Sequence, residues 1–443
     1  MFFRDKAVFL IAHEILKPGF YIKYRKMMKN QWKPTSQLRE EQNRNLRKMI
    51  HYCYAHIPFY KMHFEAAGVD PNQIHQVQDL ERIPAITKED IRRNKDAFIP
   101  KGAYQRYYVR NTGGTTGTPL TYRISRYDRF LSAALLYRGW SAAGYKLGDK
   151  MLFLAGSSLM PDIESGITNR MNEIVRNTKF LSSFEMSERN LSRYTDILNS
   201  WKPYFLRGYP SALCEFADYI ASNNLTTPSI KAVFTTSEKL FPTMRKKIEE
   251  TLNSRIFDGY GANDGGLSSF ECDHGNMHID TERSILEIVD DENCQIQDGT
   301  GNILATSLQN YAMPLIRYRV GDRAVATSEI CSCGRGLTIM REIDGRTVSV
   351  FVTPNDELVH GWFFQHIFWE IGESVEKYKV VQKSKELIEI NIVPGDGFSE
   401  ETIRRIRGFI EPKSKDWTID IKLVDSIPKP HSGKTIYIES EIR

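Results

Sequence analysis

The stretch Asn111-Thr-Gly-Gly-Thr-Thr-Gly-Thr-Pro-Leu120 decides how the rest of the sequence is interpreted. Its three glycines let the backbone turn sharply, so that N–H groups and threonine hydroxyls can converge on one anion. No lysine follows the last glycine, which separates it from the P-loop pattern. A lysine that neutralises phosphate must therefore come from elsewhere in the chain. The alternative is a solvated Gly/Thr turn between strands.

The composition is that of a globular protein with more than one domain. The chain has 443 residues and is 41% hydrophobic, enough for two or three domains with large cores. No run approaches the roughly 18 apolar residues that span a bilayer. Ala7–Leu16 contains His13 and Glu14 and lacks a cleavage site of small residues, so no signal peptide is predicted. Six cysteines are too few for a disulfide scaffold, and we expect a cytoplasmic protein.

The positive charge is concentrated at the start of the chain. Residues 1–50 carry twelve Lys/Arg and four Asp/Glu, although the net charge of the whole chain is only +5. The basic run Tyr21–Lys29 is typical of a solvated helix face, and it would also suit peripheral contact with an anionic membrane. Nucleic acid is a less suitable partner, because the basic character does not extend over a whole domain.

Periodicity predicts an α/β protein. Residues 1–100 are expected to be helical, with Thr87 capping a helix from Lys88. From about Tyr107, short β-rich runs alternate with helical segments, which indicates crossover units and a largely parallel sheet. The expected strands are 151–154, 204–206, 232–235 and 255–258, and the expected helices are 126–139, 188–201, 211–223 and 243–253.

The pattern changes twice more toward the C-terminus. Residues 282–325 favour strands and turns, with turns expected at Asp298-Gly299 and Gly301-Asn302. A boundary is expected near Asp344-Gly345-Arg346. We therefore predict a large domain over 1–345, with mixed and parallel sheets and a β-rich subdomain, and a small α+β domain over 346–443.

Seven short motifs follow the Gly/Thr loop idea in a fixed order. Together with that loop they are Arg207-Gly-Tyr-Pro-Ser211, Thr235-Thr-Ser-Glu238, Asp258-Gly-Tyr-Gly-Ala-Asn-Asp-Gly265, Tyr318-Arg-Val-Gly-Asp322, Asp344-Gly-Arg346 and Ile427-Pro-Lys-Pro-His-Ser-Gly-Lys434. This ordered set resembles the adenylate-forming ligase superfamily, within it the phenylacetate-CoA ligase branch and its CapK-type relatives of capsular polysaccharide biosynthesis. The resemblance covers nearly the whole chain and implies a small C-terminal domain that moves.

The resemblance implies an ATP site. The loop would hold the β- and γ-phosphates through Thr112, Gly113, Gly114, Thr115, Thr116, Gly117 and Thr118. Tyr260 would stack on adenine, and Asp322 would accept hydrogen bonds from the ribose. Base and ribose would also be lined by Ser237, Glu238, Asp258 and Gly259.

The resemblance also implies the groups that act on the reacting atoms. Lys434 would bridge the carboxylate and the α-phosphate, supplying the lysine that the loop lacks. Asp264 stands where the family has the glutamate that ligates Mg²⁺, with one methylene less of reach. Arg346 lies at the expected hinge, where Val348 replaces the charged pivot of many relatives.

Four residues form a candidate zinc site. Cys331 and Cys333 lie one residue apart, and Cys272 and His278 lie about fifty residues upstream. This set fits tetrahedral Zn²⁺, with His274 as a substitute ligand. Reduced cysteines without metal and a disulfide are the alternatives.

The expected activity is ATP-dependent conversion of a carboxylic acid to an acyl-adenylate. The acyl group would then pass to CoA, or to an amine or hydroxyl of an acceptor such as an amino acid or amino sugar. Two other hypotheses stay open: a catalytically quiet nucleotide-binding or scaffold protein of the same fold, and a zinc-containing nucleic-acid-binding protein.

Overall fold

The computed structural model describes most of the chain and divides it into two compact units. The described residues are 2–102, 105–111, 120–155, 171, 173–183, 186–346, 350–356, 358–411, 413–428 and 437–442. Unit 1 is Met1–Asp344 and unit 2 is Gly345–Arg443. The roles that we assign to the two predicted domains stay predictions.

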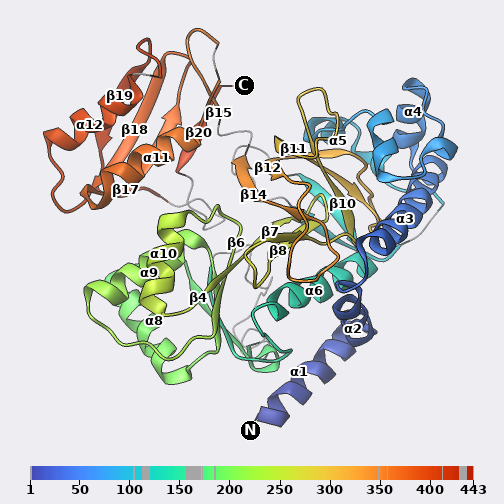
Figure 1. Ribbon diagram of the computed structural model, residues 1–443, viewed down its shortest axis with the longest axis horizontal. Helices are drawn as coiled ribbons and strands as arrows, with labels where there is room; N and C mark the ends of the chain where they lie inside the picture. The colour runs from blue at the N-terminus through green and yellow to red at the C-terminus, as the bar shows by residue number, and fades with distance from the viewer. Residues whose placement is uncertain are drawn as a thin grey trace. The chain divides into compact units, whose positions relative to one another are not determined.

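The chain begins with helices (Figure 1). They are α1 (Phe2–Leu16), α2 (Phe20–Asn30), α3 (Thr35–His56), α4 (Pro58–Ala66) and α5 (Lys88–Arg93), with the short 3₁₀ helices η1 (Pro71–Gln73), η2 (Val77–Arg82) and η3 (Lys95–Phe98). Thr87 caps α5 as predicted, since its side chain accepts a hydrogen bond from the Asp90 N–H. No helix among the described residues is long and apolar enough to cross a membrane.

An eight-stranded mixed sheet forms the centre of unit 1. Its order is β13-β9-β8-β7-β6-β5-β3-β4, and the strands from β7 to β4 are parallel. The remaining three pairs are antiparallel. The strands are β3 (Met151–Ala155), β4 (Thr178–Ser182), β5 (Phe205–Gly208), β6 (Ala232–Thr236), β7 (Ile256–Ala262), β8 (Leu267–Glu271), β9 (Met277–Ile279) and β13 (Ile339–Met340).

Helices cover both faces of the parallel part of this sheet. One face packs on α8 (Glu188–Trp201), α9 (Pro210–Ser222) and α10 (Pro242–Leu252), with Leu152, Leu198 and Val233 in its core (Figure 1). The other face packs on α6 (Arg126–Ser141) and the two N-terminal helices, with Phe153, Phe205 and Trp140 in its core. These elements match the predicted helices and strands to within a few residues.

A β-rich part and a hairpin complete unit 1. The second sheet has the order β10-β11-β12-β14, and β1 pairs with β2 in a separate antiparallel hairpin. Their bounds are β1 (Tyr107–Asn111), β2 (Thr121–Ser125), β10 (Ser284–Val289), β11 (Gly299–Ser307), β12 (Tyr318–Ala326) and β14 (Glu342–Arg346).

One turn prediction in this part is wrong. Gly301 and Asn302 lie inside β11, where the register shifts between Asn302 and Leu304, instead of forming a turn. A Cβ on Gly301 would lie 2.4 Å from the carbonyl oxygen of Val289. The glycine therefore permits a close approach between strands, and its residue type alone does not distinguish that use from a turn.

Unit 2 is a small α+β structure. Its four-stranded sheet has the order β19-β18-β17-β20, and α11 and α12 pack with it around Phe364, Ile390 and Ile406. The elements are β15 (Val350–Val352), β16 (Leu358–His360), α11 (Trp362–Ile371), η5 (Gly372–Ser374), β17 (Val375–Gln382), β18 (Leu387–Pro394), α12 (Glu400–Ile410), β19 (Thr418–Leu423) and β20 (Ile438–Ser440). The predicted α/β class, with its β-rich part and small C-terminal α+β part, is confirmed.

Candidate functional site

The candidate nucleotide-binding residues follow β5, β6 and β7, whose carboxyl ends lie at one edge of the sheet because the strands are parallel and adjacent. Glu238 Oε2 accepts a hydrogen bond of 3.0 Å from the Ser211 N–H, which ties the turn after β5 to the turn after β6. Ser237 adopts the left-handed conformation, with φ 71°. Ser237 and Glu238 are thus presented at this edge of the sheet.

Asp258 is held within the sheet. The Thr235 hydroxyl donates to Asp258 Oδ1 at 2.6 Å, and the Asp258 N–H donates to Glu271 Oε2 at 2.9 Å. Burial raises the pKa of Asp258 above its usual range. These contacts fix the backbone from which Gly259 and Tyr260 follow.

Two tyrosine–carboxylate hydrogen bonds connect the eight-stranded sheet to the second sheet. The Tyr260 hydroxyl, on β7, donates to Asp322 Oδ2, on β12, at 2.8 Å. The Tyr318 hydroxyl, on β12, donates to Asp264 Oδ2 at 2.8 Å. Asp264 Oδ1 also accepts from the Gly265 N–H at 3.1 Å. The structure therefore brings together three residues that the sequence separates by up to sixty positions.

These hydrogen bonds leave both carboxylates able to act as acceptors. Burial and the neighbouring Asp264 raise the pKa of Tyr318 far above its usual range, so this phenol stays a neutral donor. Each carboxylate oxygen has a second lone pair after accepting one hydrogen bond. Asp264 can thus offer oxygen to a hard cation such as Mg²⁺, and Asp322 can accept from hydroxyl groups.

Several predicted site residues lie outside the described residues. They are Lys434 and the loop residues Thr112, Gly113, Gly114, Thr115, Thr116, Gly117 and Thr118. Arg346 ends β14, but its side chain is not described. The ends of β1 and β2, Asn111 and Thr121, are paired with each other and flank the loop in the chain.

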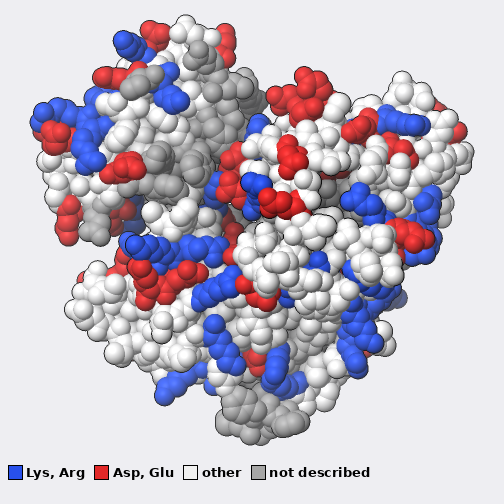
Figure 2. Space-filling model, viewed as in Figure 1, with Lys and Arg blue, Asp and Glu red and all other residues white. Residues whose placement is uncertain are grey.

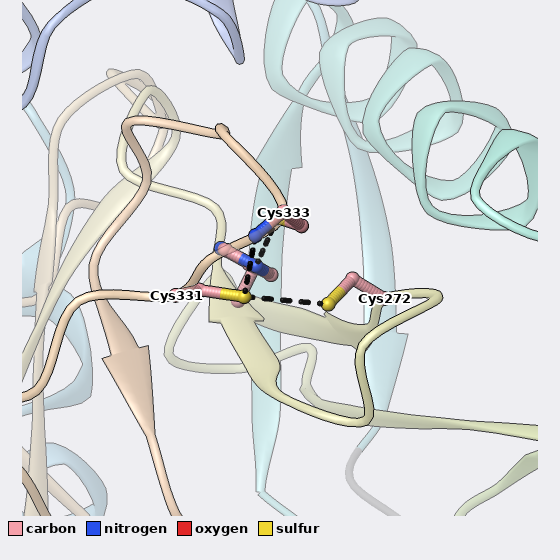
Figure 3. A group of neighbouring side chains, drawn as sticks. Cys272, Cys331 and Cys333 are labelled. Atoms are coloured by element: carbon pink, nitrogen blue, oxygen red, sulfur yellow. Dashed lines mark hydrogen bonds between the residues drawn. The ribbon is translucent and has the colours of Figure 1, made fainter.

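The predicted cysteine and histidine ligands form one cluster. The ligand atoms of Cys272, His278, Cys331 and Cys333 all lie within 4.8 Å of one another. Cys272 Sγ and Cys331 Sγ are 3.7 Å apart, too far for a disulfide, and both cysteines are free (Figure 3). Two thiolates on a tetrahedral zinc with Zn–S bonds of about 2.3 Å stand roughly 3.7 Å apart.

The orientation of His278 also suits a metal. Its Nδ1 lies 3.2 Å from the Leu337 carbonyl oxygen, to which it can donate, and its Nε2 faces Cys333 Sγ at 3.3 Å. A hydrogen bond from one ring nitrogen leaves the other nitrogen as the ligand, the arrangement found in metal sites. The predicted substitute His274 instead contacts Ser332 Oγ through Nδ1 at 2.8 Å.

The sequence-based prediction gave no role to two residues that the structure places beside the site. Tyr318 holds Asp264, and Glu271 accepts from both the Asp258 N–H and Arg245 Nη2. Tyr318 opens the motif that contains Asp322, so its position in that motif was a usable signal. Glu271 lies on β8 with no motif around it, and only the strand pairing reveals its contact.

Comparisons with known proteins agree with this geometry. The profile of the CapK C-terminal domain family matches residues 351–441. A phenylacetate-coenzyme A ligase of Thermus thermophilus is 26% identical over 366 residues, 79% of each chain. Protein CapK of Staphylococcus aureus is 26% identical over 295 residues, 66% of this chain and 64% of that protein.

The fold is shared with a solved structure of 2-hydroxyisobutyryl-CoA ligase in the postadenylation state. The TM-score is 0.72 at 19% sequence identity, and the match covers 93% of this chain and 91% of that one. At this identity the match shows the fold alone. With the family profile and the two relatives, it places this chain in the adenylate-forming ligase superfamily, in the branch of the phenylacetate-CoA ligases and CapK.

Proposed function

We propose that this protein uses ATP to convert a carboxylic acid into an acyl-adenylate and then transfers the acyl group to an acceptor. The observation that carries the proposal is the pair of tyrosine–carboxylate hydrogen bonds, Tyr260–Asp322 and Tyr318–Asp264. They bring an aromatic ring and two carboxylates to the edge of the sheet where α/β folds bind nucleotides. The names of the relatives point to the same chemistry.

In the first step, a carboxylate oxygen of the acid attacks the α-phosphorus of ATP. The new bond joins that oxygen to phosphorus, and the bond from phosphorus to the bridging oxygen breaks, so pyrophosphate leaves with the electron pair. The protein positions the reactants and offsets negative charge. In our proposal Tyr260 stacks on the base, Asp322 accepts from the ribose, and Asp264 ligates Mg²⁺, which would neutralise phosphate charge.

In the second step, the acceptor's nucleophile attacks the acyl carbon and AMP leaves. A CoA thiol is the acceptor that the ligase relatives favour. An amine or hydroxyl acceptor, such as an amino acid or an amino sugar of polysaccharide biosynthesis, is the acceptor that the CapK relative suggests. We place Lys434, in the small mobile domain over 346–443, at the carboxylate and α-phosphate during the first step, and the reaction in the cytoplasm.

We also propose that Cys272, His278, Cys331 and Cys333 hold a structural Zn²⁺. The support is the convergence of their ligand atoms and the hydrogen bond that orients His278. Four protein ligands leave no open position for substrate, which is the pattern of structural zinc. The metal would fasten the loop between β12 and β13 to β8 and β9.

The N-terminal helices are proposed to make peripheral contact with an anionic membrane. On α1, Ile11 is 60% and Ile15 73% exposed, and on α2 Ile22 is 74% exposed. Lys and Arg side chains gather over α2 on the face shown in Figure 2. Apolar side chains beside basic ones are the combination that binds anionic lipid surfaces.

Replacing Lys434 tests the activation step. With an acid that supports ATP–pyrophosphate exchange, Lys434→Ala is expected to lower the exchange rate about 10²-fold or more, because the charge that develops at the α-phosphate loses its cation. Lys415→Ala, which removes an exposed lysine of the same unit, is the control and should not change the rate. Exchange at the wild-type rate in Lys434→Ala would refute the assignment of this lysine.

Metal analysis tests the zinc site. The purified protein is expected to contain about one zinc per chain, and Cys331→Ser to lose it, because a structural site needs all four ligands. Removal of zinc by a chelator should lower the thermal unfolding midpoint of the unchanged sequence. Cys294→Ser, at an exposed cysteine, should retain the metal. A wild-type protein that is free of zinc, with all six cysteines open to thiol reagents, would contradict the assignment.

Vesicle sedimentation tests the membrane contact. The protein is expected to sediment with phosphatidylglycerol vesicles and not with phosphatidylcholine vesicles, and salt should weaken the binding. Ile11→Asp combined with Ile15→Asp should abolish sedimentation. Ile330→Asp, at a residue that is 88% exposed elsewhere, is the control. Equal sedimentation of wild type and the double variant would rule this contact out.

A further inference from the structure

The base of the β1–β2 hairpin is unusually basic. Residues 105–129 contain five arginines and a single acidic residue, Asp128. Both oxygens of Asp128 accept from Arg283, at 2.9 and 2.8 Å, and both residues are buried. The only carboxylate of the segment is therefore already neutralised by an arginine from outside it. The five arginines are Arg106, Arg110, Arg123, Arg126 and Arg129.

Three of these arginines have no acidic partner. In the part of the chain that the structure describes, Arg106, Arg123 and Arg126 form no ion pair. The Arg126 N–H donates to the Arg106 carbonyl oxygen at 2.8 Å, which brings the two residues together. Uncompensated guanidinium groups this close to one another favour the binding of an anion.

Aromatic rings lie among the arginines. The Arg123 guanidinium lies 4.3 Å from the centre of the Tyr107 ring, and the Arg129 guanidinium lies 4.1 Å from the centre of the Tyr108 ring. Tyr107 is 40% exposed, although large aromatic side chains usually bury their area. The combination of arginine and exposed aromatic rings is typical of surfaces that bind phosphates and bases.

Two hollows meet at this cluster. One has a volume of about 400 Å³ and is lined by Arg106, Tyr107, Tyr108 and Arg126. The other has a volume of about 340 Å³, and Gln105, Tyr107 and Arg123 are among its lining residues. Tyr107 lines both, and each volume lies in the range of small-molecule sites, roughly 300–1,000 Å³. We name the lining residues Arg106, Tyr107, Tyr108, Arg123 and Arg126 the arginine–tyrosine groove.

We propose that the arginine–tyrosine groove binds the phosphates of a nucleotide-bearing acyl acceptor, an inference that rests on the proposed function. Guanidinium groups bind phosphate oxygens in pairs, and a tyrosine face receives a base. The two acceptor types left open above share this chemistry when the amino sugar is nucleotide-linked, because coenzyme A and such a sugar both carry a nucleoside diphosphate. The groove belongs to the hairpin whose strands flank residues 112–119 in the chain.

Direct binding measurements test the groove. Calorimetric titrations with coenzyme A and with UDP are compared for wild type, Arg106→Gln, and Arg123→Gln combined with Arg126→Gln. The matched control is Arg193→Gln on α8, which removes an arginine that also rests on a tyrosine ring, 5.6 Å from its centre. Circular dichroism checks that each variant is folded, and Arg106 offers a second variant at an exposed position.

We expect at least one of the two probes to bind, and the double variant to bind it about tenfold more weakly or worse, since charge-assisted hydrogen bonds to phosphate are lost. The control should bind as wild type does. Loss of coenzyme A binding identifies CoA as the acceptor, and loss of UDP binding identifies a nucleotide-linked sugar. Neither result requires the acid to be known, so a failure here is distinct from a failure to activate an acid.

Three results would overturn the proposal. The first is unchanged affinity of the double variant for a probe that wild type binds. The second is an equal loss of ATP affinity in the double variant, which would assign the groove to the nucleotide of the first step. The third is binding of single-stranded RNA with no binding of either probe, which would make the groove a nucleic-acid surface.

Discussion

The candidate site depends on two hydrogen bonds that cross from one sheet to another. Tyr260 reaches from the eight-stranded sheet to Asp322, and Tyr318 reaches back from the second sheet to Asp264. Each bond joins a neutral phenol to a carboxylate, which is stronger than a bond between neutral groups. The sheets can hold a nucleotide between a ring and two carboxylates only while this connection fixes their edges. The backbone contacts of Asp258 and Glu238 then position the turns around it.

Much of the fold could be predicted because local pattern and tertiary environment agree. α8 and α12 begin and end at the predicted residues, and each carries apolar residues at helical spacing that the core buries, such as Leu191 and Leu198. The parallel sheet followed from strands that alternate with helices. The order of the nucleotide motifs was also readable, because glycines and small polar residues cluster wherever the chain must turn sharply at a strand end.

The rest depends on contacts between distant residues. Arg138 is fully buried and binds Glu282 at 2.6 Å as well as Asp280, which no periodicity within α6 announces. Gly301 permits a close strand approach that the sequence alone makes indistinguishable from a turn. The cluster of Cys272, His278, Cys331 and Cys333 was predicted from spacing and ligand type, yet the orientation of His278 required the Leu337 carbonyl, whose position only the fold supplies.

The most direct test of the account is a hydroxamate-trapping screen over a broad panel of carboxylic acids. Hydroxylamine intercepts an acyl-adenylate whatever the natural acceptor is. The account predicts that at least one acid yields a hydroxamate in an ATP-dependent reaction that releases pyrophosphate and AMP in equal amounts. A folded protein that binds ATP but yields no hydroxamate with any acid would contradict it, and would indicate a catalytically quiet nucleotide-binding protein of the same fold.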